Sequence, residues 1–192
     1  MTRYSLDQPV RIGFACNADT YARMMDDGAM AAFKALGSFE HHLCNEPSAW
    51  EEAPPENPAA VDALVAFAAN LDALLVCHGS PRLTRAILDR LPNLKLIAEV
   101  EGDRFSQRID VNAAAERGIT VVDTTNGSSY PVSEWALAMA MIGLRNAGSL
   151  YRRMIAGETP FRTNEDRVAD FSWNGELTGK KVGLIGCGYI GR

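Results

Sequence analysis

The stretch "ALLVCHGSPRLTRAILDRLPNLKLIAEV" (residues 73–100) holds the pattern that decides the fold. Two short and mostly apolar runs, 73–79 and 94–100, flank a segment at 84–89 that has the composition of a helix. Apolar runs of this length on either side of a helix are typical of parallel strands that are buried on both faces. The stretch therefore predicts a strand–helix–strand unit in a parallel sheet.

The same alternation continues on both sides of this unit. Upstream, "VRIGFAC" (10–16) predicts a strand, and Asn17 or Asp19 can cap a helix that runs to Gly37. We further predict helices over 59–70 and 111–117. The strands expected to share one parallel sheet are Val10–Cys16, Leu74–Cys77, Leu94–Ala98 and Ile119–Val122. This order of elements indicates a doubly wound α/β domain.

A different pattern runs from about Pro131 to Ala156 and predicts one long helix, with the proline in its first turn. Its apolar side chains are too dense for a single stripe, so we expect the helix to be buried on several sides, as an interdomain or subunit contact. A solvated surface of this kind would exceed what monomers usually tolerate. We therefore expect a homodimer through the 131–156 helix.

Composition excludes several classes of function. The chain is 47% apolar with a net charge of −5, and its basic residues are interspersed with acidic ones, so we expect neither nucleic acid nor a membrane as partner. The N-terminus lacks the apolar region of a secretory signal, and the longest apolar run is far too short to cross a bilayer. The four cysteines are scattered, which predicts free thiols, no metal site and a cytoplasmic protein.

The last residues, "KKVGLIGCGYIGR" (180–192), predict a strand that enters a G-x-G-x-x-G loop. In a dinucleotide-binding turn, Gly186 permits the turn, Gly188 lets the backbone approach a pyrophosphate, and Gly191 lets the next helix pack closely. The amides of Tyr189 and Ile190 would then face the phosphates. An ordinary glycine-rich turn could show the same residues. The acidic residue that reads the ribose is expected past Arg192, so the cofactor is NAD or NADP.

Three segments together carry a family resemblance: "RIDVNAAAERGITVVDTT" (108–125), "PVSEWALAMAMIGLRN" (131–146) and "WNGELTGKKVGLIGCGYIGR" (173–192). In this order they resemble the D-isomer-specific 2-hydroxyacid dehydrogenases.

The resemblance implies a flavodoxin-like substrate domain whose first segment is residues 1–125 and which the far C-terminus completes. It also implies a crossover helix and connector over 126–176, and the first strand and glycine loop of a truncated Rossmann domain over 177–192.

The resemblance implies hydride transfer between NAD(P)H and a 2-oxo or D-2-hydroxy acid. In the family an Arg holds the oxo acid, a His passes a proton and a Glu raises the pKa of that His. All three are expected after Arg192, so no catalytic residue is assigned here, and the 192 residues alone are expected to be inactive. Two alternatives stay open: a dinucleotide-sensing scaffold protein, like the corepressors of this architecture, or a natural fragment that acts only through its dimer-forming helix.

The resemblance also implies two substrate loops. The first is "CHGSPRLT" (77–84), where the backbone of Gly79 and Ser80 would hold the substrate carboxylate and His78 could add a donor. The alternative is a plain helix cap, with Ser80 as N-cap and Pro81 at the first helical position.

The second loop is "EVEGDRFSQRID" (99–110), and it departs from the glycine-rich family pattern, with Gln107 where an Asp or Asn usually stands. Gly102, Asp103 and Arg104 are its candidate substrate residues. Glu101 and Asp103 would repel a carboxylate while Arg104 would attract it, so either Arg104 faces the ligand or the ligand is not a simple small oxo acid. The alternative is a solvated charge cluster.

Ser129, just before the long helix, matches the segment that lines the nicotinamide side of the cleft in the family. We therefore predict a cofactor contact there. A helix-capping serine needs no ligand and is the alternative.

Overall fold

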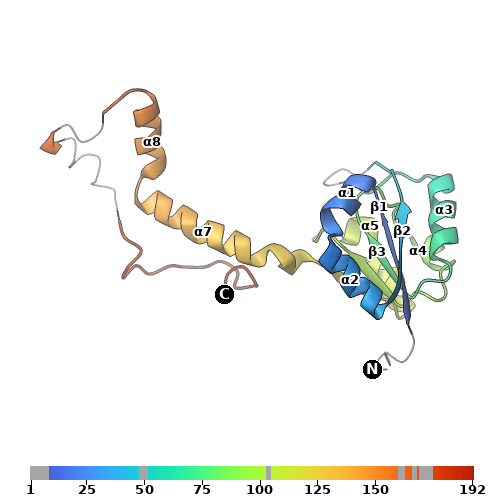
Figure 1. Cartoon of the computed structure of the whole chain (residues 1–192). Coiled ribbons are helices and arrows are strands. Elements are labelled where there is room, and N and C mark those ends of the chain that lie inside the picture. Colours follow the sequence, from blue (N-terminus) through green and yellow to red (C-terminus); the bar gives the residue numbers. More distant parts are fainter. Residues whose placement is uncertain (1–8, 48–51, 103–104, 160–162, 166–167, 169–174) are drawn as a thin grey trace. The chain divides into compact units, whose positions relative to one another are not determined.

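The computed structural model describes residues 9–47, 52–102, 105–159, 163–165, 168 and 175–192. The chain divides into two units, 1–125 and 126–192, which are described separately below (Figure 1). Among the described residues, no helix is both long and apolar enough to cross a membrane.

The first unit is built on one sheet of five parallel strands in the order β2-β1-β3-β4-β5. The strands are β1 (Val10–Cys16), β2 (Gly37–Leu43), β3 (Ala73–Val76), β4 (Leu96–Glu99) and β5 (Thr120–Asp123). This is the flavodoxin-like strand order. The four strands predicted from sequence are present and pair in parallel, so the prediction of one parallel sheet is confirmed.

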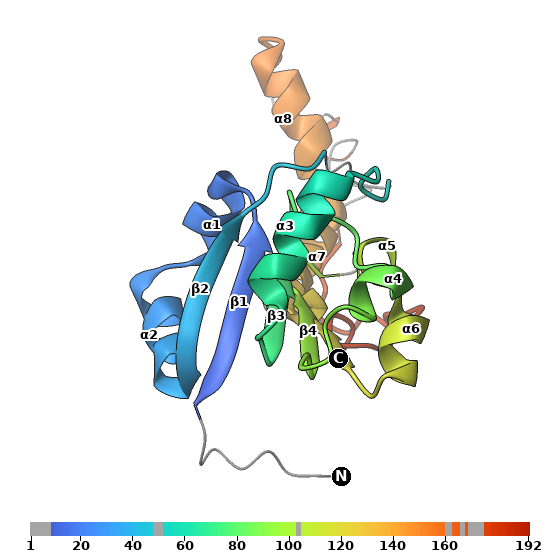
Figure 2. The same ribbon diagram turned by 90° about the vertical axis from the view of Figure 1, so that its right-hand side faces the viewer.

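Helices cover both faces of the sheet, as a parallel sheet requires (Figure 2). On one face lie α1 (Ala18–Met24) and α2 (Asp27–Leu36), which pack on Ile12, Phe14 and Leu75. On the other lie α3 (Pro58–Ala68), α4 (Arg85–Leu88) and α6 (Val111–Glu116). Their apolar residues join the sheet in one buried cluster that includes Leu64, Leu74, Val76, Leu88, Ile97 and Ala113. The short helix α5 (Phe105–Arg108) follows β4.

Strand β2 was missed by the sequence analysis, which left residues 38–45 unassigned. It is an edge strand, and in its sequence, "GSFEHHL", only Phe39 and Leu43 are strongly apolar. Aromatic contacts hold it instead: Phe39 stacks on Phe33 at 4.8 Å between ring centroids, and His41 stacks on Tyr21 at 3.9 Å. These contacts depend on residues of the preceding helices, which is why a local pattern does not show them.

Both long helices expected from sequence are interrupted. The first breaks before Asp26, whose carboxylate accepts a hydrogen bond of 2.7 Å from the Ala29 amide and so caps a new helix. After the short turn Thr125–Ser128, where the second unit begins, come α7 (Ser129–Leu144) and α8 (Ala147–Ile155). Asn146 between them has a φ of 50°, a left-handed conformation that asparagine tolerates and that ends a helix.

Helix α7 is exposed around its circumference, and its expected burial in an interdomain or subunit contact stays a prediction. Trp135 is 66% exposed, Leu137 is 50% exposed and Met139 is 45% exposed. Among the described residues of α7, Ser129 alone is buried.

The strand predicted at Lys181–Gly186 is not formed. Residues 181–186 are irregular, and Val182, Leu184 and Ile185 are largely exposed. A strand needs a neighbour to pair with its backbone, and none of the described residues of this unit forms a strand. The expected opening of a Rossmann domain is therefore present as a sequence and not as a folded element.

The sheet face that carries α1 and α2 is open over β3 and β4. A groove of about 930 Å³ lies there, and among the side chains that line it are Ile12, Met25, Phe33, Leu75, Leu96 and Ala98. Side chains of β1, such as Ile12, line the groove together with those of β3 and β4, so three strands border it.

The amino-terminal ends of three strands are held together by Asp72, which directly precedes β3. Its carboxylate accepts hydrogen bonds from the backbone N–H and Nε of Arg11, both at 3.1 Å, and from Nζ of Lys95 at 2.9 Å. Partial burial of Asp72 alone would raise its pKa, but the hydrogen bonds from Arg11 and Lys95 outweigh it and lower the pKa to about 2. The ionised carboxylate thus stabilises the fold.

We predict that this contribution is lost in acid. Because the pKa of Asp72 is about 2 in the folded chain and about 4 when unfolded, the stabilisation is full above pH 4 and declines as the pH falls from 4 to 2. After allowance for screening by solvent, Asp72→Asn should lower the free energy of unfolding by about 1 kcal/mol at pH 7, and by much less at pH 2.5. Urea unfolding followed by circular dichroism measures both values.

The matched control is Asp62→Asn, since Asp62 is 69% exposed and pairs with Arg90 at the surface. It should change stability by a few tenths of a kcal/mol. Equal destabilisation by Asp72→Asn at pH 7 and pH 2.5 would contradict the assignment.

Candidate functional site

Two loops meet at the carboxyl edge of the parallel sheet, which is where α/β proteins bind ligands. The first follows β3 and the second follows β4, and a short parallel bridge joins Leu83 to Ile109. The Leu83 amide donates to the Arg108 carbonyl at 2.7 Å, and the Asp110 amide donates to the Leu83 carbonyl at 2.9 Å. The two predicted substrate loops therefore lie side by side in the first unit.

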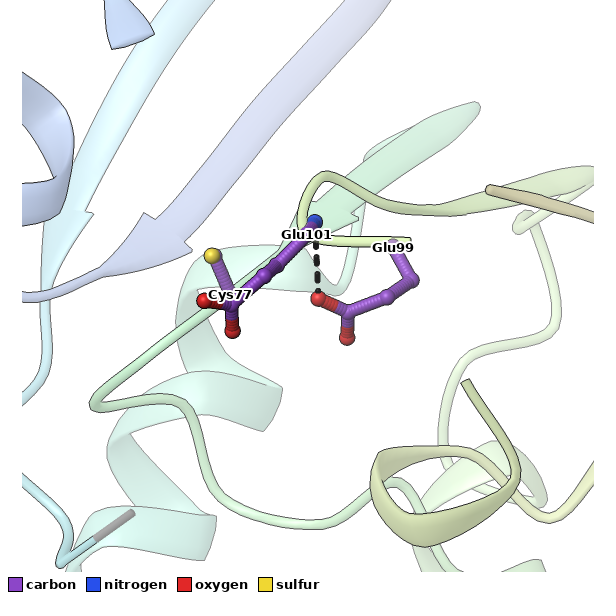
Figure 3. Close-up of side chains that lie close together, drawn as sticks. All are labelled: Cys77, Glu99 and Glu101. Carbon is purple, nitrogen blue, oxygen red and sulfur yellow. Dashed lines mark hydrogen bonds between the residues drawn. The ribbon is translucent and has the colours of Figure 1, made fainter. Parts of the chain in front are cut away.

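A buried ion pair lies beneath these loops. Nη1 of Arg108 donates to Oε1 of Glu99 at 2.9 Å, and the two side chains are 3% and 0% exposed. The same carboxylate oxygen accepts a hydrogen bond of 3.1 Å from the Glu101 amide, as Figure 3 shows. Arg108 also reaches Glu101 with Nη2, at 3.4 Å from Oε2. One guanidinium thus joins the end of β4 to the loop that follows it.

His78 is held on both ring nitrogens. Its Nδ1 lies 3.1 Å from Nη2 of Arg108, and its Nε2 lies 2.5 Å from Oε2 of Glu101. A guanidinium nitrogen can only donate, so Nδ1 must accept and the proton of a neutral imidazole is on Nε2, directed at Glu101. To donate to a substrate carboxylate, as the sequence analysis suggested, His78 would have to leave Glu101.

The backbone of the first loop is folded into a tight turn. Gly79 has a φ of 91°, and a Cβ there would lie 2.5 Å from the Cys44 carbonyl oxygen, so glycine is required. Ser80 is fully buried, its amide donates to the Cys77 carbonyl and its hydroxyl to the Pro81 carbonyl. The helix-cap alternative for Ser80 is wrong, because α4 begins at Arg85 with Thr84 as its N-cap. That the loop binds a carboxylate stays a prediction.

In the second loop, Gly102 lies against the end of the β5 segment. A Cβ at Gly102 would be 2.5 Å from Cα of Thr125, so this glycine allows two backbones to approach closely. Asp103 and Arg104, the other predicted substrate residues, lie outside the described residues. Arg82, in the first loop, lines a surface hollow with Pro54 and Arg90.

The predicted cofactor residues belong to the second unit. Ser129 is the first residue of α7 and is 6% exposed, while the N-cap residue Ser128 makes no side-chain capping bond. In the glycine loop, Gly186 has a φ of 90°, and a Cβ on Gly191 would lie 2.7 Å from the Gly186 carbonyl oxygen.

A Cβ on Gly188 would meet no neighbouring atom. The side chains of Tyr189 and Ile190, which follow it, are 60% and 48% exposed. The loop has the tight turn that a pyrophosphate site needs, but no helix begins within the described residues of this loop.

The side chains of Cys77, Glu99 and Glu101 come close enough to suggest a metal site, since their candidate ligand atoms lie within 4.8 Å of one another (Figure 3). Two observations argue against it. Arg108 is bonded to both carboxylates, so a cation would have to displace a guanidinium. Burial also raises the pKa of the Cys77 thiol, which disfavours the thiolate that a metal binds. We assign no metal to this cluster.

Comparisons with known proteins agree with this architecture. Residues 33–173 match the family model described as "D-isomer specific 2-hydroxyacid dehydrogenase, catalytic domain". The chain belongs to this family. A D-3-phosphoglycerate dehydrogenase from Mycobacterium tuberculosis is 30% identical over 131 residues, which cover 68% of this chain and 23% of that relative.

Two solved structures share the fold and contain nicotinamide cofactors. One is a formate dehydrogenase from Staphylococcus aureus in complex with NAD (TM-score 0.54, 22% identity, 94% of this chain and 49% of that chain). The other is an acyclic imino acid reductase in complex with NADPH and D-Arg (TM-score 0.58, 17% identity, 94% and 50%). The chain thus spans about half the length of these structures and about a quarter of the mycobacterial relative.

Sequence reasoning did not identify Arg108 and Glu99 as a pair. A signal was available, because Glu99 interrupts the otherwise apolar run "LIAEV", and an acid in a buried strand requires a basic partner nearby. Arg108, nine residues later, is that partner.

We predict that Arg108→Met lowers the free energy of unfolding by about 3 kcal/mol, because it leaves Glu99 buried without its ion-pair partner. The double variant Glu99→Gln/Arg108→Met should recover at least half of that loss, since no charge then remains buried. Urea unfolding measures both, and Arg85→Met, which removes an exposed pair with Glu116, is the control. Additive losses in the double variant would show that the two residues are not coupled.

Proposed function

We propose that this chain supplies the first segment of the substrate domain, the crossover helix and the phosphate loop of an NAD(P)-dependent D-2-hydroxyacid dehydrogenase. The proposed reaction is hydride transfer between the reduced nicotinamide and the carbonyl carbon of a 2-oxo acid. The observation that carries the proposal is the pair of bridged loops at the carboxyl edge, in a chain whose family is established by residues 33–173.

In this proposal the cofactor supplies the hydride, and the residues of this chain position the substrate. The tight turn at Gly79 presents backbone to the edge of the sheet, and the bridge between Leu83 and Ile109 fixes the second loop beside it. The buried pair of Arg108 and Glu99 holds this arrangement from below. Such pre-organisation lowers the entropic cost of placing the reacting carbon.

The remaining parts of the proposed enzyme would come from polypeptide beyond these residues. The open groove over β3 and β4 supports this, because a parallel sheet normally has both faces covered and an apolar groove of about 930 Å³ can accept another helix. The glycine loop at Gly186, Gly188 and Gly191 fits a pyrophosphate by residue type and by its turn. Paired strands beside residues 181–186 would give that loop its full shape.

We predict that residues 1–192 alone do not oxidise NADH or NADPH with glyoxylate, hydroxypyruvate or phenylpyruvate, whereas the full-length gene product does so with at least one of them. The described residues offer one substrate edge and an unsupported phosphate loop, and positioning of both reactants is worth several orders of magnitude in rate. The assay is loss of reduced-nicotinamide absorbance with both proteins side by side. Turnover by residues 1–192 would show that the catalytic residues lie in this chain, and His78 would be the first candidate for the proton donor. If the full-length protein instead binds NADH tightly but reduces none of the acids, dinucleotide sensing is favoured.

We also propose that α7 forms a homodimer contact. Its exposed apolar side chains, which include Trp135 and Met139, need a partner to leave water. Light scattering of the full-length protein at tens of micromolar should give the mass of a dimer, and Trp135→Glu/Met139→Glu should give a monomer. Lys34→Glu, on the exposed side of α2, is a charge-changing control that should stay dimeric. A monomeric wild type would refute the contact.

A further inference from the structure

The carboxyl edge of the sheet carries more negative than positive charge. Glu99 ends β4, Glu101 follows it and Asp123 ends β5. Arg108 is bonded to both glutamates, so one guanidinium is shared between two carboxylates. His78 adds no charge, because its Nδ1 accepts from Arg108.

Other charged groups near this edge do not reverse the balance. Arg82 belongs to the first loop, but it lines the hollow at the start of α3 with Pro54 and Arg90. The described edge is therefore net negative.

Glu101 is the glutamate that a ligand would meet. Glu99 is 0% exposed, whereas the side chain of Glu101 is 24% exposed at the point where the two loops meet. Its Oε2 is held at 2.5 Å from Nε2 of His78, so the carboxylate has a fixed position rather than turning away into solvent. A fixed charge that is partly shielded from water acts on nearby ligand charges more strongly than a mobile surface charge does.

We propose that Glu101 makes the site selective for 2-oxo acids whose single negative charge is the reacting carboxylate, against those that carry a phosphate or a second carboxylate. This inference rests on the proposed function. A phosphate carries about −1.5 to −2 charges at neutral pH, and with no cation in excess at the described edge it would be repelled by Glu101. The selectivity would separate this protein from its relatives named D-3-phosphoglycerate dehydrogenase.

The test compares hydroxypyruvate with 3-phosphohydroxypyruvate, which differ by the phosphate, as substrates of the full-length gene product. At low salt, kcat/KM should be at least about tenfold higher for hydroxypyruvate. Glu101→Gln keeps an oxygen that can accept from His78 but removes the charge, and it should reduce the ratio of the two kcat/KM values about fivefold, mainly through KM for the phosphorylated acid. Raising the ionic strength from about 0.05 to 0.5 M should lower the wild-type ratio more than that of the variant.

The control is Glu116→Gln, which removes the same charge at the end of α6, where Glu116 is 60% exposed and paired with Arg85. It should leave the ratio unchanged. A wild-type preference for the phosphorylated acid, or a ratio that Glu101→Gln does not move, would overturn the proposal while leaving the dehydrogenase function intact.

If neither acid is reduced, the selectivity is decided by binding to residues 1–192, and the proposed function itself fails only if glyoxylate and phenylpyruvate are not reduced either. Amide shifts of Gly79 and Glu101 in two-dimensional NMR should then respond more to hydroxypyruvate than to 3-phosphohydroxypyruvate at equal concentration. Glu101→Gln should make the two responses similar. Equal responses in the wild type, or no response to either acid, would refute the role of Glu101.

Discussion

Every strand of the sheet runs in the same direction, and most features of the first unit follow from this constraint. Parallel neighbours cannot be joined by tight turns, so each strand must be followed by a crossover that returns over one face. All loops that leave the strands therefore gather at one edge. The residues after β3 and β4, which are 20 positions or more apart in the sequence, become neighbours there through the bridge of Leu83 and Ile109.

The parts of the fold that sequence predicted are those governed by local apolar patterns. Strands formed within the runs at 10–16, 73–79, 94–100 and 119–123, where side chains such as Phe14, Leu74 and Ile97 enter the buried clusters. Strand β2 was not predicted because it is held by ring stacking on side chains of the preceding helices, such as Tyr21 and Phe33. The expected strand at 181–186 failed for the opposite reason: its pattern is right, but a strand exists only where a partner strand is present.

The site shows the same division. The glycines at 79 and 102 were singled out as substrate residues through the family resemblance, and the structure places both where a Cβ would meet neighbouring backbone. Their contact with a substrate stays a prediction. The tautomer of His78 could not be derived from sequence, since it depends on which nitrogen faces Arg108 and which faces Glu101. Of the charge cluster noted in the second loop, Glu101 is partly exposed and bonded to Arg108, while Asp103 and Arg104 lie outside the described residues. The substrate-loop interpretation of this cluster therefore stays a prediction.

The carboxylate of Asp72 also bears on the order in which the sheet assembles. It pairs with Arg11, 61 residues earlier, and with Lys95, 23 residues later. Closing the longer loop costs more chain entropy, so β3 and β4 can pair before β1 is inserted beside β3. The contact with Lys95 would then belong to an early β3–α4–β4 unit, while the contact with Arg11 would be completed only when the amino-terminal strand arrives. A single side chain thus spans an early and a late stage of folding, and it closes the sheet at its centre.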